Sequence, residues 1–140
     1  MSRALSDLTP AARAVCEVFL TECRKAGHPV MVVQTYRSIE EQEALYAKGR
    51  SRPGPIVTHA RGGDSFHNFR CAWDICFVDP VMGKLTWEGP WDLIGGIAEK
   101  LGCIWGGHFK HVEPDRPHIE YHPEETLAQM RTRAVVRQIS

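Results

Sequence analysis

Two imidazoles and one carboxylate, carried by two short segments of the chain, have the residue types of a metal site. His67 and Asp74 lie in the segment 65–74, and His118 lies in the segment 115–121. Zn²⁺ takes nitrogen and oxygen ligands at about 2.0–2.2 Å in tetrahedral geometry, and catalytic sites use three protein ligands with water in the fourth position. These three residues therefore predict a catalytic zinc centre.

Acidic residues flank His118 on both sides. Asp115 precedes it by three residues, with Pro117 stiffening the segment between them. Asp115 is therefore a candidate to take the proton of a zinc-bound water and return it to a leaving amine. Glu120 is the competing candidate. On a strand it would share the face of His118, where it could instead support that ligand from behind.

Arg37 follows a predicted strand and precedes a predicted helix cap. An arginine at such a mouth can hold a substrate carboxylate or a developing oxyanion. From position alone, a solvated surface arginine is the more common case.

Single histidines are more often hydrogen-bonded residues than metal ligands. His59, His108, His111 and His122 are not expected to bind the metal, and of these His108 and His111 are close enough to the site to remain candidates.

Helices and strands that follow one another in irregular order along the chain are predicted to carry these residues. The pattern predicts a helix from Pro10 to Gly27, a strand over 29–35, a helix from the Ser38–Glu41 capping box to Gly49, a surface loop over 50–63, a strand over 72–78, a helix over 90–101, short strands over 103–105 and 117–121, and a terminal helix opening at 123–125. Without regular βαβ alternation, this favours an α+β fold with a small, largely antiparallel sheet. Asp74 and His118 would lie on neighbouring strands, with His67 on the loop entering the first.

The size and composition indicate one domain, residues 1–140. The apolar fraction is 43%, which is enough for a core, and the 17 basic and 17 acidic residues balance. Zero net charge argues against a nucleic-acid binder that works through bulk positive charge. No apolar run approaches the roughly 20 residues of a membrane span. The first residues lack the apolar core of a secretory signal, so we expect synthesis and retention in the cytoplasm.

The chain has five cysteines. An odd number, without a secretory signal or a CxxC pair, predicts reduced thiols rather than disulfides or a cysteine zinc ribbon. We expect all five to be small buried apolar residues.

Several segments resemble one known family. The pattern Ser65-x-His67-x6-Asp74, with Ala72, resembles the S-x-H-x-x-G-x-A-x-D motif of the zinc D-alanyl-D-alanine carboxypeptidases. It is still more similar to the phage L-alanyl-D-glutamate endopeptidases that act as endolysins. Further resemblances run in the same order along the chain, over 36–46, 57–63, 105–107 and 115–121.

The resemblance implies a hedgehog/D-Ala-D-Ala-carboxypeptidase-like fold and a set of residue roles. It implies Zn²⁺ bound by His67, Asp74 and His118, Asp115 as general base, and Arg37 and Ser65 as substrate contacts. For Ser65, a helix-cap or turn serine is the alternative. Trp105 is expected to line the substrate cleft.

The resemblance also implies hydrolysis of the L-alanyl-D-glutamate bond in the peptidoglycan stem peptide during phage lysis of a host. We expect a monomer that is not embedded in the membrane, is held in the host cytoplasm, and reaches the cell wall through a separate holin. A D-alanyl-D-alanine carboxypeptidase is a close alternative. A zinc-stabilised binding module without catalysis is another, supported by Arg70 where the family has glycine. Arg70 would either occupy a backbone position that favours glycine or reach the cleft.

Overall fold

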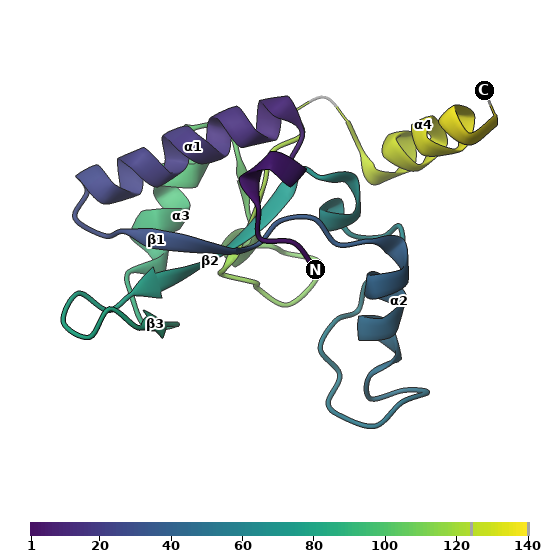
Figure 1. Ribbon diagram of the computed structural model, residues 1–140, viewed down its shortest axis with the longest axis horizontal. Helices are drawn as coiled ribbons and strands as arrows, with labels where there is room; N and C mark the ends of the chain where they lie inside the picture. Colours follow the sequence, from purple (N-terminus) through teal and green to yellow (C-terminus); the bar gives the residue numbers. More distant parts are fainter. Residues whose placement is uncertain (124, 140) are drawn as a thin grey trace.

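A five-stranded sheet forms the centre of the molecule, and its named strand pairs are antiparallel (Figure 1). The computed structural model describes residues 1–123 and 125–139, with side chains through residue 134. The strands are β1 (Val30–Gln34), β2 (Ala72–Val78), β3 (Leu85–Thr86), β4 (Ile104–Trp105) and β5 (His118–Glu120), in the order β1-β2-β5-β4 with β3 beside β2. This confirms the predicted α+β class.

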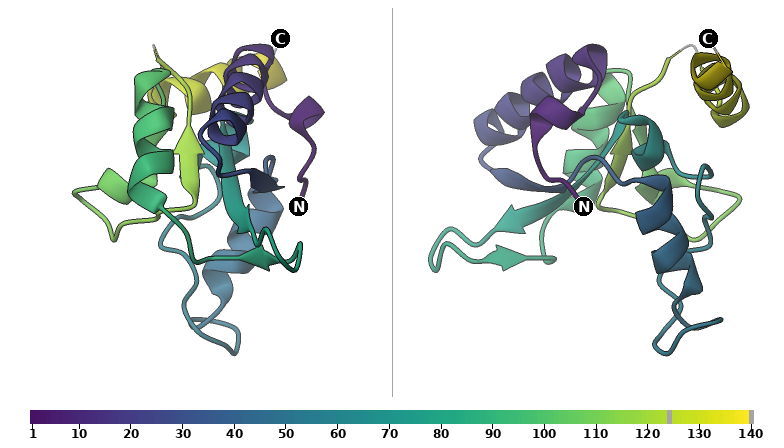
Figure 2. Two further views of the ribbon diagram at one scale, coloured as in Figure 1. Left: turned by 90° about the vertical axis from the view of Figure 1, so that its left-hand side faces the viewer. Right: turned by 45° about the vertical axis from the view of Figure 1, so that its right-hand side comes forward.

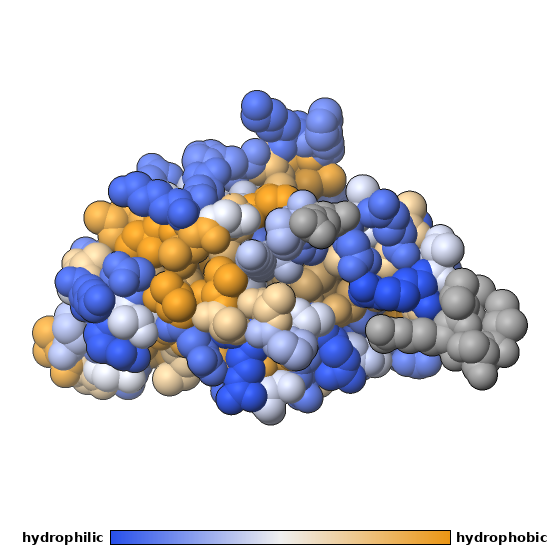
Figure 3. Space-filling view, turned by 90° about the horizontal axis from the view of Figure 1, so that it is seen from above, coloured by the Kyte–Doolittle hydropathy of each residue, from blue (hydrophilic) through white to orange (hydrophobic). Residues whose placement is uncertain are grey.

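Helices surround this sheet. They are α1 (Pro10–Lys25), α2 (Ile39–Ala47), α3 (Trp91–Lys100) and α4 (Leu127–Ile139), with short 3-10 turns η1 (Leu5–Asp7), η2 (Phe66–Phe69) and η3 (Gly106–His108). Figure 2 shows α1 and α3 together on one side of the sheet, and α2 with its following loop projecting from the opposite side. On the face seen from above α1, an apolar area lies among hydrophilic residues (Figure 3).

The central strand β2 divides its side chains between the core and the site. Trp73, Ile75 and Phe77 are buried and alternate with Asp74 along the strand. The Trp73 ring lies 6.2 Å from the Phe19 ring of α1, and the Phe77 ring lies 4.5 Å from a tryptophan ring of α3. Because successive side chains of a strand point to opposite faces, this packing turns Asp74 away from α1 and α3.

The predicted helix starts are confirmed for α1 and α2. Thr9 Oγ1 accepts a hydrogen bond from the Ala12 N–H at 3.2 Å, with Pro10 in the first helical position. Ser38 and Glu41 form the predicted reciprocal capping box, with both hydrogen bonds at 3.0 Å. These caps satisfy N–H groups that have no partner within the helix, so the helices begin where the sequence indicates.

The predicted start of the terminal helix is wrong. The helix begins at Leu127 rather than within 123–125, of which Glu124 lies outside the described residues. Thr126 and Gln129 exchange reciprocal hydrogen bonds at 2.8 and 3.2 Å. This capping box starts the helix after the acidic residues.

Trp105 does not line a cleft, contrary to the expectation. It is 3% exposed, and its indole N–H donates to the Arg116 carbonyl oxygen at 2.8 Å. The ring lies directly over Gly95 of α3, where a Cβ atom would overlap it. Glycine at position 95 therefore allows the tryptophan ring to lie this close to the helix.

Two findings concern the whole described chain. All five cysteines are buried and unpaired, as expected, and burial raises the pKa of Cys16, Cys23, Cys71 and Cys103 to about 12. Within residues 1–123 and 125–139, no helix is both long enough and apolar enough to cross a bilayer.

Arg70 occupies a backbone position that favours glycine. Its φ of 65° and ψ of 27° are left-handed, and it is the one non-glycine residue with positive φ in the described chain. Its guanidinium stacks on Tyr36 at 3.9 Å and donates to the Asp7 carbonyl oxygen at 3.2 Å. These contacts hold the side chain against the N-terminal segment, so the alternative that Arg70 reaches the cleft is wrong.

We predict that Arg70→Gly is more stable than Arg70→Ala by about 1 kcal/mol in urea unfolding. Both variants lose the contacts with Tyr36 and Asp7, so those losses cancel in the comparison. Only alanine retains the cost of a side chain at positive φ. Equal stabilities, or a more stable alanine variant, would contradict the backbone argument.

Candidate metal centre

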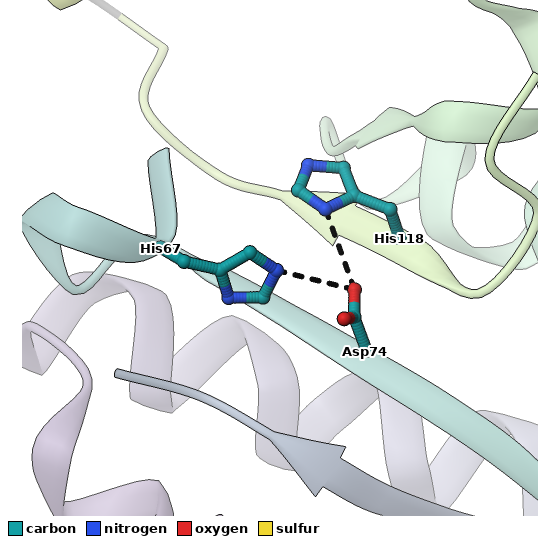
Figure 4. Close-up of side chains that lie close together, drawn as sticks. All are labelled: His67, Asp74 and His118. Atoms are coloured by element: carbon teal, nitrogen blue, oxygen red, sulfur yellow. Dashed lines mark hydrogen bonds and ion pairs between the residues drawn. The ribbon is translucent and has the colours of Figure 1, made fainter. Parts of the chain in front are cut away.

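The side chains of His67, Asp74 and His118 converge on one point (Figure 4). Oδ1 of Asp74 lies 3.2 Å from Nε2 of His67 and 3.4 Å from Nδ1 of His118. One potential ligand atom from each residue lies within 4.8 Å of the other two. Ligands about 2.1 Å from one tetrahedral ion are separated by about 3.4 Å, and both His–Asp distances match that spacing.

Strand pairing places two of the three residues. Asp74 of β2 is the direct register partner of His118 of β5. Directly opposed residues of an antiparallel pair project on the same face, so the carboxylate and the imidazole meet beside the sheet. The residue between His118 and Glu120, Ile119, points the other way and is fully buried in the core.

The third residue, His67, is held by the η2 turn. Ser65 Oγ accepts a hydrogen bond from the His67 N–H at 3.2 Å and caps this turn. The Asn68 side chain donates to the Arg37 carbonyl oxygen at 2.9 Å, tying η2 to the segment after β1. The observed contact of Ser65 is thus the helix cap; its contact with substrate remains a prediction.

Each histidine has one ring nitrogen committed to an acceptor. His67 Nδ1 lies 2.7 Å from the Thr35 carbonyl oxygen, and His118 Nε2 lies 2.7 Å from Oε2 of Glu120. A carbonyl and a carboxylate accept hydrogen bonds but do not donate them, so these nitrogens carry the ring protons. In the neutral rings, the remaining nitrogens, both turned toward Asp74, carry the lone pairs.

The electrostatics of the cluster favour a cation. Burial disfavours charge on Asp74, but hydrogen bonds from His118 and His67 outweigh it and lower the pKa of its carboxyl well below the usual range. Burial also opposes charge on His118, yet Asp74 and Glu120 raise the pKa of its imidazole. A carboxylate facing two imidazole nitrogens attracts positive charge, supplied either by protons on those nitrogens or by a metal ion between the three groups. This donor set fits Zn²⁺.

Glu120 therefore lies behind the cluster, in the supporting position that the sequence left open as one of its two roles. It is 5% exposed and bonds the nitrogen of His118 that faces away from Asp74. Carboxylates in this position orient metal-binding histidines and fix their tautomer.

Arg37 lies at the edge of the same site, with its guanidinium held by two glutamines. Its Nη atoms donate to Gln42 at 2.7 Å and to Gln34 at 2.5 Å. Gln34 is the register partner of Asp74 on β1, next to a bulge in that strand. Burial lowers the pKa of Arg37, while Asp74 and Asp115 are near enough to offset part of that effect.

One donor of Arg37 has no partner. Its Nε atom is buried and lacks a hydrogen-bond partner among the described residues, which is costly in a folded protein. The half-buried guanidinium, held by two glutamines, differs from a solvated surface arginine. Its contact with substrate remains a prediction.

Asp115 lies in the loop before β5. Its N–H donates to the Gly106 carbonyl oxygen at 2.9 Å, and its own carbonyl oxygen accepts from the His118 N–H at 3.1 Å. A Cβ atom at Gly106 would overlap the Asp115 carbonyl oxygen, so glycine permits this approach. The residue as a whole is exposed, but partial burial of its carboxyl raises its pKa, and His118, Asp74, His67 and Arg37 all act on it.

The structure thus brings the sequence-predicted residues to one region and adds supporting residues that the sequence did not single out: Gln34, Thr35, Asn68 and His122. Asn68 had a usable signal, because it stands three residues after Ser65 at capping-box spacing. Thr35 and Gln34 had none, since their contacts depend on how β1 passes η2 in three dimensions.

Comparison with known proteins gives consistent matches. The D-alanyl-D-alanine carboxypeptidase family matches residues 58–121. The peptidoglycan L-alanyl-D-glutamate endopeptidase CwlK of Bacillus subtilis is 34% identical over 128 residues, covering 84% of this chain and 75% of that protein.

Solved structures share the fold. The L-Ala D-Glu endopeptidase ChiX of Serratia marcescens aligns with a TM-score of 0.58 at 22% identity, covering 84% of this chain and 83% of that one. The vancomycin-resistance D,D-pentapeptidase VanY, solved with Zn(II), aligns with a TM-score of 0.64 at 16% identity, covering 84% and 74%. These alignments confirm the predicted fold class.

We predict that His67→Ala abolishes stoichiometric zinc binding while His59→Ala does not. His67 is buried beside Asp74, whereas His59 is exposed and outside the cluster. Loss of a ligand should weaken binding by more than the roughly 10–100-fold that supporting residues contribute. Metal analysis after dialysis measures this, and unchanged zinc content in His67→Ala would remove His67 from the site.

Proposed function

The chain belongs to the D-alanyl-D-alanine carboxypeptidase family of peptidases, and we propose that it is a zinc-dependent endopeptidase of bacterial peptidoglycan. The proposed substrate is the L-alanyl-D-glutamate bond of the stem peptide. The observation that carries the proposal is the cluster of His67, Asp74 and His118, with its spacing suited to one tetrahedral ion. The choice of bond is supported by the relative CwlK, whose name states that bond.

The residues around the cluster suit amide hydrolysis. When bound, zinc would supply a Lewis acid that lowers the pKa of water and polarises a carbonyl group. Asp115 would take the proton of the attacking water and return it to the leaving amine. Its raised pKa brings the carboxyl closer to neutral pH, where such exchange is most effective.

Arg37 would hold negative charge on the substrate or in the transition state. The two glutamines fix the plane of its guanidinium before substrate arrives, and a donor that is already oriented loses little on binding. Asp74 keeps 20% of its side chain exposed while the two imidazoles are buried, so solvent and substrate can approach from the side of the carboxylate.

The setting of the activity is part of the proposal. The resemblance of the motifs to phage endopeptidases supports a role as an endolysin in host lysis. Such an enzyme would be held in the host cytoplasm and would reach the cell wall after a separate holin permeabilises the cytoplasmic membrane.

We predict that the purified enzyme clears a suspension of chloroform-treated bacteria. A chelator should abolish clearing, and added Zn²⁺ should restore it. The measurement is turbidity with and without each reagent. Absence of clearing under all conditions would favour the non-catalytic binding module, and clearing that resists the chelator would contradict the role of zinc.

We predict that the digest contains a new amino group on D-glutamate, with L-alanine left on the glycan side. Dinitrophenyl labelling and mass analysis of the released muropeptides detect both ends. Release of D-alanine as the sole product would instead identify a D-alanyl-D-alanine carboxypeptidase.

We predict that Asp115→Asn keeps stoichiometric zinc and loses activity by about 10²–10⁴-fold, the usual contribution of a general base. Asparagine preserves the size of the side chain and the backbone bonds to Gly106 and His118. The matched control is Glu113→Gln, an exposed acid of the same loop, which should leave activity within about threefold. Zinc loss from Asp115→Asn would recast Asp115 as a ligand.

A further inference from the structure

His122 lies just beyond the end of β5, behind the metal centre. Its side chain is 8% exposed, and its Nε2 atom lies 2.9 Å from Oε1 of Glu120. Its Nδ1 atom lies 3.0 Å from the backbone oxygen of Glu125. Both partners are acceptors, and a neutral imidazole donates through one nitrogen only. We assign that donor to Nε2, which faces the Glu120 carboxylate at the shorter distance.

The two oxygens of Glu120 are divided between two histidines. Oε2 accepts from His118 at 2.7 Å and Oε1 from His122 at 2.9 Å. Within the described part of the chain, His122 is the hydrogen-bond partner of Oε1. Although burial disfavours the charge, the two imidazoles lower the pKa of Glu120. A carboxylate held at one oxygen can rotate about its last bond, whereas one held at both oxygens cannot.

The ring of His122 also contacts the other ligand-bearing segment. It stacks on Phe66 with ring centroids 3.7 Å apart and an interplanar angle of 6°. Phe66 opens the η2 turn and immediately precedes His67. His122 therefore joins two parts of the site, because it holds the partner of His118 by a hydrogen bond and packs against the turn that carries His67.

We propose that His122 is a positioning residue of the metal centre. It acts through Glu120, which it holds in the orientation that keeps the proton of His118 on Nε2 and the Nδ1 lone pair directed at the metal. Partners of this kind behind metal-binding histidines typically contribute about 10–100-fold to metal affinity. This inference rests on the proposed zinc site. It places His122 behind Glu120, which itself lies behind the ligand His118.

The test compares three variants by zinc affinity, measured by competition with a chelator of known strength. His122→Phe keeps a flat ring on Phe66 and removes both polar contacts. His122→Gln restores a donor near the position of Nε2 without the ring. The matched control is His108→Phe, because His108 also pairs with a glutamate, Glu99, and packs against an aromatic ring, but is not part of the three-residue cluster.

We expect His122→Phe to bind zinc about 10-fold or more weakly, with His122→Gln within about threefold of the wild type and His108→Phe unchanged. At saturating zinc, the KM of His122→Phe should be unchanged. Wild-type affinity in His122→Phe would overturn the inference, and together with a loss in His122→Gln it would indicate packing alone. Equal losses in the two variants would also overturn it, because the restored donor would then have no effect. Failure of the wild type to bind zinc would instead overturn the proposed function.

A measurement on the wild type covers the case in which His122→Phe does not fold. In ¹H NMR of the zinc-loaded protein, the Nε2–H protons of His118 and His122 should both give slowly exchanging downfield signals. Glu120→Gln should remove or shift both signals, since they share one carboxylate. A His122 ring proton that exchanges freely with solvent would overturn the inference.

Discussion

The register between β2 and β5 is the constraint on which the site depends. It sets Asp74 opposite His118 on one face of the sheet, while Trp73 and Ile119 fill the core on the other. A slip of one residue would exchange the two faces, burying the charged groups and exposing the apolar ones. The same apolar burial that stabilises the sheet therefore fixes the geometry of two of the three proposed ligands.

Hydrogen bonds behind the cluster decide what its atoms can do. Thr35 and Glu120 each accept a hydrogen bond from one imidazole, so the opposite nitrogen of each ring faces Asp74. The carboxylates of Asp74 and Glu120 make the electrostatic potential at this point negative, which favours a bound cation. Arg37, held by its glutamines beside this point, supplies positive charge for a substrate without occupying the centre.

Much of the fold followed from local patterns in the sequence. The capping box at Ser38 and the alternation along 72–78 predicted α2 and β2 because both signals act over a few residues. The start of α4 and the burial of Trp105 were missed. The first depended on the capping box between Thr126 and Gln129, which the prediction did not consider, and the second on the packing of Trp105 against Gly95 of the neighbouring helix. The convergence of the site residues followed from the motif, but their supporting partners did not.

Two imidazoles and one carboxylate should hold a single zinc ion with a position left for water. X-ray absorption at the zinc edge of the purified protein measures the neighbours of that ion. We expect one zinc per chain, four nitrogen or oxygen neighbours at about 2.0–2.2 Å, the multiple-scattering pattern of two imidazoles, and no sulfur. A sulfur neighbour at about 2.3 Å would place the metal on the cysteines and contradict the proposed centre, as would a protein that binds no zinc.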